Sequence, residues 1–226
     1  MGQHRSPEHQ RFLDALAPDD VQWLRGRGLV RRFVPGATLF REGEQSDCVM
    51  FLLRGRVKIA TEAEAGREAV LAFRSPGEVL GELSAIDGQP RSASVVAVDP
   101  VEALVVATID FRAFLERTPR ATLWILTRLT ERLRDADRKR AEFGSSDTIA
   151  RVAARLLELA DDHGMPVEGG VRIDLPITQE ELASWVGSSR EGVNKALHTL
   201  RSLGWVETER RAITVRDPEA LRRRAS

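Results

Sequence analysis

Short apolar runs separated by turn residues fill the chain from about Arg31 to Ala107. Segments such as ATLF, CVMFLL, RVKIA, AVLAF, ASVVAV and EALVVA have the length and side-chain types of β-strands. Glycines recur between them at intervals of eleven or twelve residues, at Gly43, Gly55, Gly66 and Gly77. This spacing predicts an antiparallel roll or barrel with one turn per strand pair, and no helix of ordinary length fits before Asp110. Residues 1–30 have broken helical periodicity and predict a short helical opening.

After Pro119 the pattern becomes helical and stays so to about Phe143. Apolar positions follow steps of three and four, and the same line includes Arg140; its members are Leu126, Leu129, Leu133, Ala136, Arg140 and Phe143. Such a narrow seam with charged flanks is typical of a helix that pairs with its twin. The alternative is a helix that packs this stripe onto its own roll.

A Gly-Ser-Ser-Asp sequence at 144–147 breaks the helix, and Asp147 can cap the next one. Residues 164–176 predict a loop with a short strand, and two short helices and a hairpin at 205–215 follow. The fold class predicted is α+β: a β-roll domain over 1–119, a long helix over 120–143 and a further domain over 144–226.

Residues 177–206 carry the most specific pattern of the chain. Thr178 and Glu181 have capping-box spacing and begin a short helix, and Gly187 permits a tight turn. Ser188 or Ser189 can cap the second helix, and Ser188 also has capping-box spacing to Glu191. The second helix buries one face, consisting of Val193, Ala196, Leu197 and Leu200. Its other face is polar, with Arg190, Glu191, Asn194, Lys195, His198 and Arg201.

A short helix, a glycine turn and a second helix with a polar outer face predict a helix-turn-helix. Arginine and lysine can donate to guanine O6 and N7, and glutamate can accept from cytosine N4. The alternative is an ordinary helical hairpin with a solvated face. Residues 144–226 contain twelve Lys+Arg and thirteen Asp+Glu, so DNA affinity must come from a narrow local strip and from two copies in a dimer.

A second motif, GEVLGELSAIDGQPRSASV, occupies residues 77–95 within the roll. The Gly81–Ser84 segment (Gly81, Glu82, Leu83, Ser84) predicts a short helical turn whose backbone N–H groups can hold an anion. Arg91 offers a two-pronged donor for phosphate and Ser92 offers a hydroxyl. Glu82 repels phosphate, so a ribose hydroxyl is its fitting partner. Two surface β-turns with a solvated arginine are the alternative at this spacing.

Composition narrows the class of protein. The chain has 226 residues, which favours two domains, and 34 Lys+Arg balance 34 Asp+Glu. No apolar run is long enough for a membrane span, and the N-terminus lacks the apolar core of a secretory signal. With Cys48 the sole cysteine, a disulfide framework and a four-cysteine zinc or iron–sulfur site are excluded. We therefore expect a cytoplasmic protein.

The histidines give no support to an enzyme. They stand at positions 4, 9, 163 and 198, outside the roll, so a metal-dependent barrel enzyme and a haem ligand in the roll are not expected. No nucleophile and base occur at motif spacing. We expect no catalytic residues, no bound metal and no prosthetic group.

The VGSSREGVNKAL segment resembles the DNA-reading motif of the cyclic-AMP receptor protein/fumarate–nitrate regulator (CRP/FNR) family, and its actinobacterial branch most closely. The resemblance covers nearly the whole chain: a cyclic-nucleotide-binding jelly roll, a dimerisation helix and a winged helix-turn-helix. It implies that Arg190, Glu191 and Lys195 read bases, and Thr178 and Ser189 complete the predicted DNA-binding set. Gly192 replaces the family's usual threonine and places a glycine within the recognition helix.

In the roll, the resemblance implies a cassette that holds the cyclic phosphate and ribose of a nucleotide. The predicted ligand-binding set is Gly81, Glu82, Leu83, Ser84, Arg91, Ser92, Arg132 and Asp137. Arg132 matches the arginine that pairs with the cassette glutamate. The family's purine-reading threonine, with a serine or asparagine after it, is replaced here by Ala136 and Asp137.

The resemblance implies a homodimeric transcription regulator that binds a palindromic double-stranded operator with half-sites like TGTGA. Cyclic AMP is the expected effector and RNA polymerase a further partner; no membrane is involved. One alternative is a regulator of this type that is independent of nucleotide or senses another ligand. A second alternative is a cyclic-nucleotide-binding module that acts on a protein partner. Activation and repression depend on promoter geometry, which the sequence does not contain.

Overall fold

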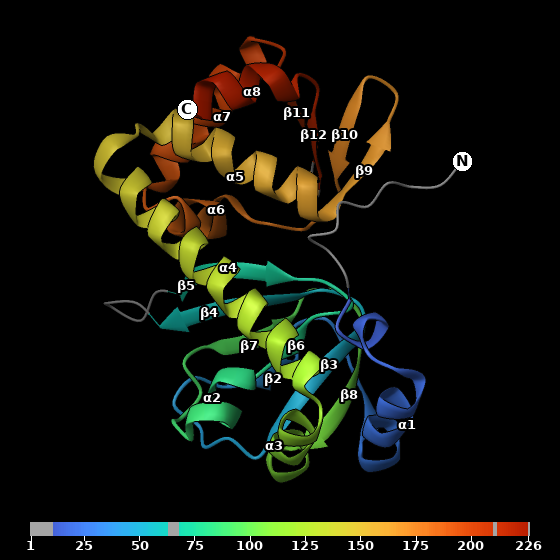
Figure 1. Ribbon diagram of the computed structural model, residues 1–226. Coiled ribbons are helices and arrows are strands. Elements are labelled where there is room, and N and C mark those ends of the chain that lie inside the picture. The colour runs from blue at the N-terminus through green and yellow to red at the C-terminus, as the bar shows by residue number, and fades with distance from the viewer. Residues whose placement is uncertain (1–10, 63–67, 210–211, 226) are drawn as a thin grey trace. The chain divides into compact units, whose positions relative to one another are not determined.

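The structure, a computed structural model, describes residues 11–62, 68–209 and 212–225 (Figure 1). Gly66 lies outside these ranges, and the side chain of Phe143 is also outside the described part. The chain forms two units, and the long helix α4 (Pro119–Ser145) contributes to both. Its residues up to Arg132 belong to the first unit, and those from Leu133 belong to the second.

Two four-stranded sheets form the first unit. One has the order β1 (Leu29–Phe33), β8 (Val101–Ala107), β3 (Cys48–Arg54) and β6 (Val79–Leu80). The other has the order β2 (Thr38–Phe40), β7 (Ser94–Ala97), β4 (Val57–Glu62) and β5 (Glu68–Arg74). Every apolar run predicted to be a strand is one. The exposed strand β1 and the two-residue strand β6 were not predicted, because neither has an apolar run of its own.

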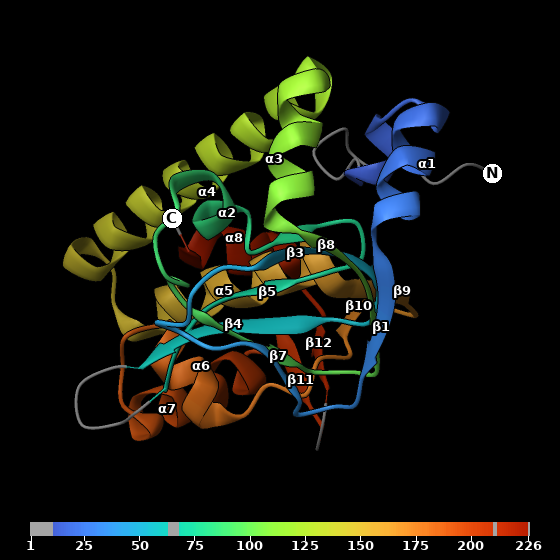
Figure 2. The same cartoon turned by 90° about the horizontal axis from the view of Figure 1, so that it is seen from below.

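Aromatic residues join the first sheet to the helices around it. Phe12 stacks on Phe51 with ring centroids 5.1 Å apart, and Trp124 of α4 meets Phe12 edge-on at 5.0 Å. Helix α1 (Pro18–Arg27) begins at Pro18, where a missing N–H costs no hydrogen bond. Helix α3 (Thr108–Arg117) continues directly from β8, as Figure 2 shows, and buries Phe111 and Phe114. No separate helix was predicted there, since only ten residues carry its pattern.

The seam predicted on α4 is mostly exposed in the single chain. Leu126 and Leu133 are 53% and 63% exposed, but Leu129 is partly buried against the core of the roll. Leu123, which the prediction left out, is 64% exposed. On a helix of 3.6 residues per turn, Leu123, Leu126 and Leu133 lie on one side, and Leu129 lies at the edge of that side next to the roll. The exposed leucines are three and seven residues apart, a spacing that fits a three-and-four seam.

The second unit is a helical core with a small sheet. Asp147 caps α5 (Thr148–His163) by accepting from the Ala150 N–H at 2.9 Å, as predicted. Helices α6 (Gln179–Trp185) and α7 (Arg190–Ser202) follow, and β11 (Val206–Thr208) pairs with β12 (Ile213–Val215). Two predictions were incomplete: residues 164–176 hold two strands, β9 (Gly164–Val167) and β10 (Gly170–Ile173), and the arginine-rich tail is a helix, α8 (Pro218–Ala225).

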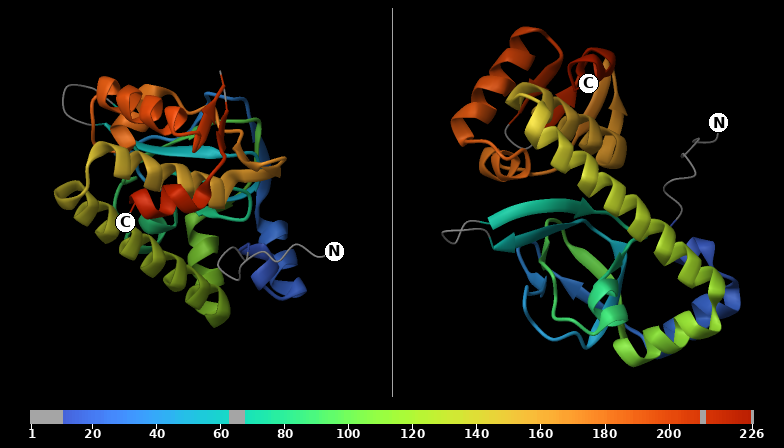
Figure 3. Two further views of the ribbon diagram at one scale, coloured as in Figure 1. Left: turned by 90° about the horizontal axis from the view of Figure 1, so that it is seen from above. Right: turned by 60° about the vertical axis from the view of Figure 1, so that its left-hand side comes forward.

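The strands of this unit form one sheet of order β11-β12-β10-β9. Helix α8 lies along α5, and its Ala220 and Leu221 are buried (Figure 3). Across the described ranges, no helix is both long and apolar enough to cross a membrane.

Candidate functional site

The cassette begins at a glycine that no other residue can replace without strain. Gly81 has φ of 79° and precedes helix α2 (Glu82–Asp87). A Cβ at this position would collide with the guanidinium of Arg91 and approach the Phe40 ring to 2.9 Å. Glycine therefore serves both the left-handed backbone and the close approach of Arg91.

Arg91 lies beneath this turn and is 4% exposed. Its guanidinium donates to the Gly81 carbonyl at 3.0 Å and to the Cys48 carbonyl at 2.6 Å, and it stacks over the Phe40 ring at 3.8 Å. Burial lowers the pKa of Arg91, and it raises the pKa of the Cys48 thiol to about 11. The side chain predicted to bind phosphate therefore braces the backbone of the cassette in this structure.

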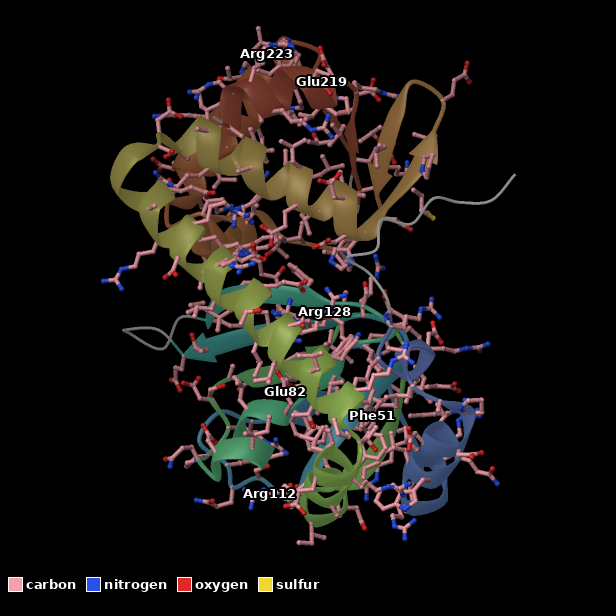
Figure 4. The ribbon with its side chains drawn as sticks, viewed as in Figure 1. Phe51, Glu82, Arg112, Arg128, Glu219 and Arg223 are labelled. Atoms are coloured by element: carbon pink, nitrogen blue, oxygen red, sulfur yellow. The ribbon has the colours of Figure 1, made fainter. Side chains whose placement is uncertain are left out.

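Glu82 faces α4 (Figure 4) and forms a short ion pair with Arg132. The Glu82 side chain is 6% exposed, so this pairing compensates a nearly buried carboxylate. Arg132 also approaches Glu78 at 3.4 Å, and Arg74 pairs with the same Glu78 at 3.1 Å. The resemblance implied the Glu82–Arg132 pair. Glu78 was missed, because a second acidic residue four positions earlier has no recognisable motif.

The other predicted ligand residues have varied surroundings. Ser84 is buried and its hydroxyl donates to the Pro90 carbonyl at 3.3 Å, which closes the loop between them. Leu83 is 43% exposed and Ser92 is exposed at the surface of the roll. Asp137 is an exposed residue of α4 in the second unit. Gly81, Glu82, Arg91 and Arg132 are thus the members linked by direct contacts.

The short helix α6 has the capping box that the sequence predicts. The Thr178 hydroxyl accepts from the Glu181 N–H at 3.1 Å, and the Glu181 carboxylate accepts from the Thr178 N–H at 2.8 Å. Ser189 caps α7 by accepting from the Gly192 N–H at 3.0 Å. Ser188 does not form the second predicted capping box; its hydroxyl lies 3.2 Å from that of Thr148. The reason is that α7 starts at Arg190, one residue later than that box requires.

Helix α7 divides into two faces as expected. Val193, Ala196, Leu197 and Leu200 are buried, while Arg190, Glu191, Asn194, Lys195, His198 and Arg201 are exposed. Gly192 lies in the first turn, and a Cβ there would meet the Ser188 hydroxyl at 2.6 Å. Gly192 thus allows Ser188, in the turn before α7, to pack closely against the first turn of α7. The sequence alone did not show this contact.

Electrostatics distinguish this face from the rest of the unit. Within the described part of the chain, no ion pair engages Arg190, Glu191 or Lys195. Two other arginines of this unit are engaged: Arg172 with Glu209 at 3.0 Å and Arg216 with Glu207 at 2.7 Å. An unpaired, exposed Arg/Glu/Lys set on one helix can donate to and accept from base edges.

Comparisons with known proteins agree on both units. Residues 30–118 match the model of the cyclic nucleotide-binding domain, and residues 150–224 match the Crp-like helix-turn-helix domain. The CRP-like cAMP-activated global transcriptional regulator of Mycobacterium tuberculosis is 37% identical over 193 residues, which are 85% of this chain and 86% of that protein.

The chain belongs to the CRP/FNR family. It is a DNA-binding transcriptional regulator, and its fold is the α+β fold of that family. The crystal structure of the Thermus thermophilus catabolite activator protein is similar, at 30% identity and a TM-score of 0.54, over 95% of this chain and 97% of that one. The global nitrogen regulator of Synechocystis is 32% identical over 85% of this chain and 87% of its own length. Relatives with similar sequence identity to this chain are thus named as regulators of different kinds, one cAMP-activated and one a nitrogen regulator.

Among the residues that the structure describes, no group of three or more His, Cys, Asp or Glu could hold a metal ion. Surface pockets of the first unit include one beside Trp124 and Arg128 and one beside Phe33 and Pro100. Neither of these pockets is lined by the cassette residues.

Proposed function

We propose that this protein is a homodimeric CRP/FNR regulator that reads a palindromic operator with α7 and responds to a cyclic nucleotide held by its roll. Cyclic AMP is the proposed effector, and half-sites like TGTGA are the proposed target. Arg190, Glu191 and Lys195 read the bases. Thr178 and Ser189, at the starts of α6 and α7, contact the DNA backbone. The proposed boundaries remain 1–119 for the roll, 120–143 for the dimer helix and 144–226 for the DNA-binding domain.

The exposed, unpaired face of α7 is the observation that carries this proposal. An arginine, a glutamate and a lysine stand in the first two turns, and the opposite face is fully committed to the core. A recognition helix contacts base edges with such N-terminal residues when it lies in the major groove. A dimer would present two of these helices about 34 Å apart, which fits a palindrome.

Two observations support a dimer formed through α4. Leu123, Leu126 and Leu133 are exposed on one side of the helix. In a monomer this apolar surface would remain in contact with water. The resemblance to the CRP/FNR family implies a homodimer paired through this helix. The protein would act where its DNA lies, in the cytoplasm, and RNA polymerase is a further proposed partner. We propose no catalytic role and no prosthetic group.

Cyclic AMP is proposed because the M. tuberculosis relative is named as cAMP-activated and because the phosphate and ribose cassette is retained. One observation favours a second candidate, a regulator that senses another ligand or none. Ala136 and Asp137 stand at the purine-reading positions of the family, and alanine cannot hydrogen-bond to a base. The 32% identical nitrogen regulator is consistent with such divergence.

A binding experiment separates these candidates. Purified protein is titrated onto a labelled palindrome and onto a scrambled duplex, each with and without cyclic AMP. We expect selective binding of the palindrome, and calorimetry should detect uptake of cyclic AMP. No uptake of cyclic AMP or cyclic GMP at millimolar concentration would favour the second candidate, while equal binding to both duplexes would contradict the proposed operator.

A further inference from the structure

Helix α8 carries three consecutive arginines in its last turn. Arg222 and Arg223 are exposed, whereas Ala220 and Leu221 hold the helix against α5. Arg222 pairs with Glu219 at 2.5 Å, one turn earlier. Among the described residues, no ion pair engages Arg223, which is labelled at the outer side of α8 in Figure 4. The helix therefore presents Arg223 as an exposed cationic group beside the paired Arg222.

The third arginine fixes where this turn lies. Arg224 forms a short ion pair with Asp147, the residue that caps α5. The Ala150 N–H and Arg224 both lower the pKa of Asp147, the N–H more strongly, so the carboxylate is charged at neutral pH. The last turn of α8 is thus tied to the N-terminus of α5.

The N-terminus of α5 in turn lies beside the start of α7. The Thr148 and Ser188 hydroxyls are 3.2 Å apart, and Thr148 is also a near neighbour of Gly192. Arg151 of α5 donates to the Val186 carbonyl at 2.8 Å, in the turn between α6 and α7. The arginine turn of α8, the cap of α5 and the first turn of α7 therefore form one corner of the second unit.

This corner is basic although residues 144–226 have slightly more acidic than basic side chains. Arg151, Arg190 and Arg224 stand there against Asp147 and Glu191, and Arg222 and Arg223 precede Arg224 in the last turn of α8. Helix N-termini add positive potential at the same place, since the first turns of α5 and α7 meet there. Arginine is suited to phosphate because its planar guanidinium can donate two parallel hydrogen bonds.

We propose that Arg222 and Arg223 bind backbone phosphates of the DNA that flanks the half-site read by α7. This inference rests on the proposed function and extends it beyond α7 to a contact that is independent of base sequence. The arginine turn is linked to the start of α7 through the N-terminus of α5, and this link favours DNA over an acidic protein surface as the partner.

The test uses the full-length protein with Arg222 and Arg223 both replaced by alanine. Fluorescence anisotropy measures affinity for the palindrome and for a scrambled duplex over a range of salt concentrations. We expect affinity to fall by a similar factor on both duplexes, about threefold to tenfold. The slope of log K against log salt should become shallower by about 0.9 for each phosphate that the variant no longer neutralises, or roughly 2 for one phosphate per subunit.

Three comparisons sharpen the result. On a palindrome trimmed at the outer end of each half-site, wild-type protein should lose the same factor and the double variant should lose none. Arg223→Lys should retain most of the salt slope, because it keeps the charge. Glu219→Gln should bind slightly more tightly, because it removes a negative charge one turn before Arg222. Circular dichroism melting would show that each variant is folded.

Wild-type affinity and salt slope in the double variant would overturn the proposal. Reduced transcription with unchanged DNA affinity would also overturn it and would assign the arginines to an acidic protein partner. A loss on the palindrome alone would contradict a phosphate contact. If wild-type protein binds neither duplex, the proposed function itself fails, and the flanking contact fails with it.

Discussion

The cassette and the recognition helix place their arginines in opposite surroundings. Arg91 is buried, stacks on Phe40 and donates to the carbonyls of Gly81 and Cys48. Arg190 is exposed at the start of α7, and no ion pair in the described part of the chain engages it. One arginine maintains the shape of a site, and the other is available to a partner.

This difference has an energetic consequence for each unit. Removing the buried arginine takes one donor away from each of the Gly81 and Cys48 carbonyls, which costs stability before any ligand binds. Removing an exposed arginine costs little stability and acts on binding directly. Variants in the roll should therefore change folding and ligand uptake together, whereas variants on α7 should change DNA binding alone.

The largest expected effect comes from separating the two copies of α7. Leu126→Glu with Leu133→Glu places charges on the outward line of α4 and should give monomers. Specific DNA affinity should fall by about 10²–10⁴, because the second half-site no longer adds to the first. Analytical ultracentrifugation and anisotropy measure the two outcomes. Ile109→Glu, at an exposed position of α3, serves as the control and should remain dimeric; a dimeric double variant would place the interface elsewhere.

The next effect tests the exposed arginine. Arg190→Ala should weaken operator binding by about 1–3 kcal/mol and relax the preference at one guanine, with little change in thermal stability. His198→Ala, on the exposed face one turn beyond Lys195, should bind as wild type. If Arg190→Ala weakens binding equally on specific and scrambled DNA, this arginine contacts phosphate and reads no base.

The matching variant in the roll is Arg91→Ala. We expect a loss of about 1–3 kcal/mol in stability, since the Gly81 and Cys48 carbonyls each lose the donor that Arg91 supplies, together with loss of cyclic AMP uptake. Arg91→Lys keeps the charge but cannot bridge the two carbonyls while stacking on Phe40, so it should recover little. Melting curves and calorimetry test both variants. Full stability in Arg91→Ala would show that the brace contributes nothing.

A smaller effect concerns coupling between the roll and DNA binding. Because Ala136 and Asp137 lack the family's purine-reading pair, cyclic AMP should change DNA affinity by fivefold or less, about 1 kcal/mol. Ala136→Thr with Asp137→Ser should increase both nucleotide affinity and that change. Fluorescence anisotropy with and without cyclic AMP measures this change in DNA affinity. A hundredfold enhancement in the wild-type protein would show that these two positions matter little.

The smallest effect is a dependence on pH at Asp147. Its pKa is lowered in the folded protein by the Ala150 N–H and then by Arg224. The ionised group therefore stabilises the second unit above its ordinary pKa, and this contribution disappears as pH falls through the lowered value. Asp147→Asn keeps a capping acceptor but not the charge, so its melting temperature should fall less steeply between pH 7 and 3. An equally steep fall would exclude Asp147 as a source of the acid dependence.

Sequence patterns predicted α7 almost completely, because a helix-turn-helix depends on local signals: the Thr178 box, the turn at Gly187 and the two-faced periodicity. They predicted less of the cassette. The stacking of Arg91 on Phe40 and the sharing of Arg132 between Glu78 and Glu82 join residues 50 or more positions apart, and no local pattern encodes such contacts. Leu129 shows the same limit, since its direction depends on which face of α4 meets the roll.

The most direct test of the account is selection of bound sequences from a random duplex library by purified wild-type protein and by Arg190→Ala. The account predicts that wild type enriches a palindrome with half-sites like TGTGA, and that the variant enriches the same palindrome with one guanine position degenerate. Enrichment of a non-palindromic sequence, or of no sequence by the wild-type protein, would contradict α7 as a paired reader of bases.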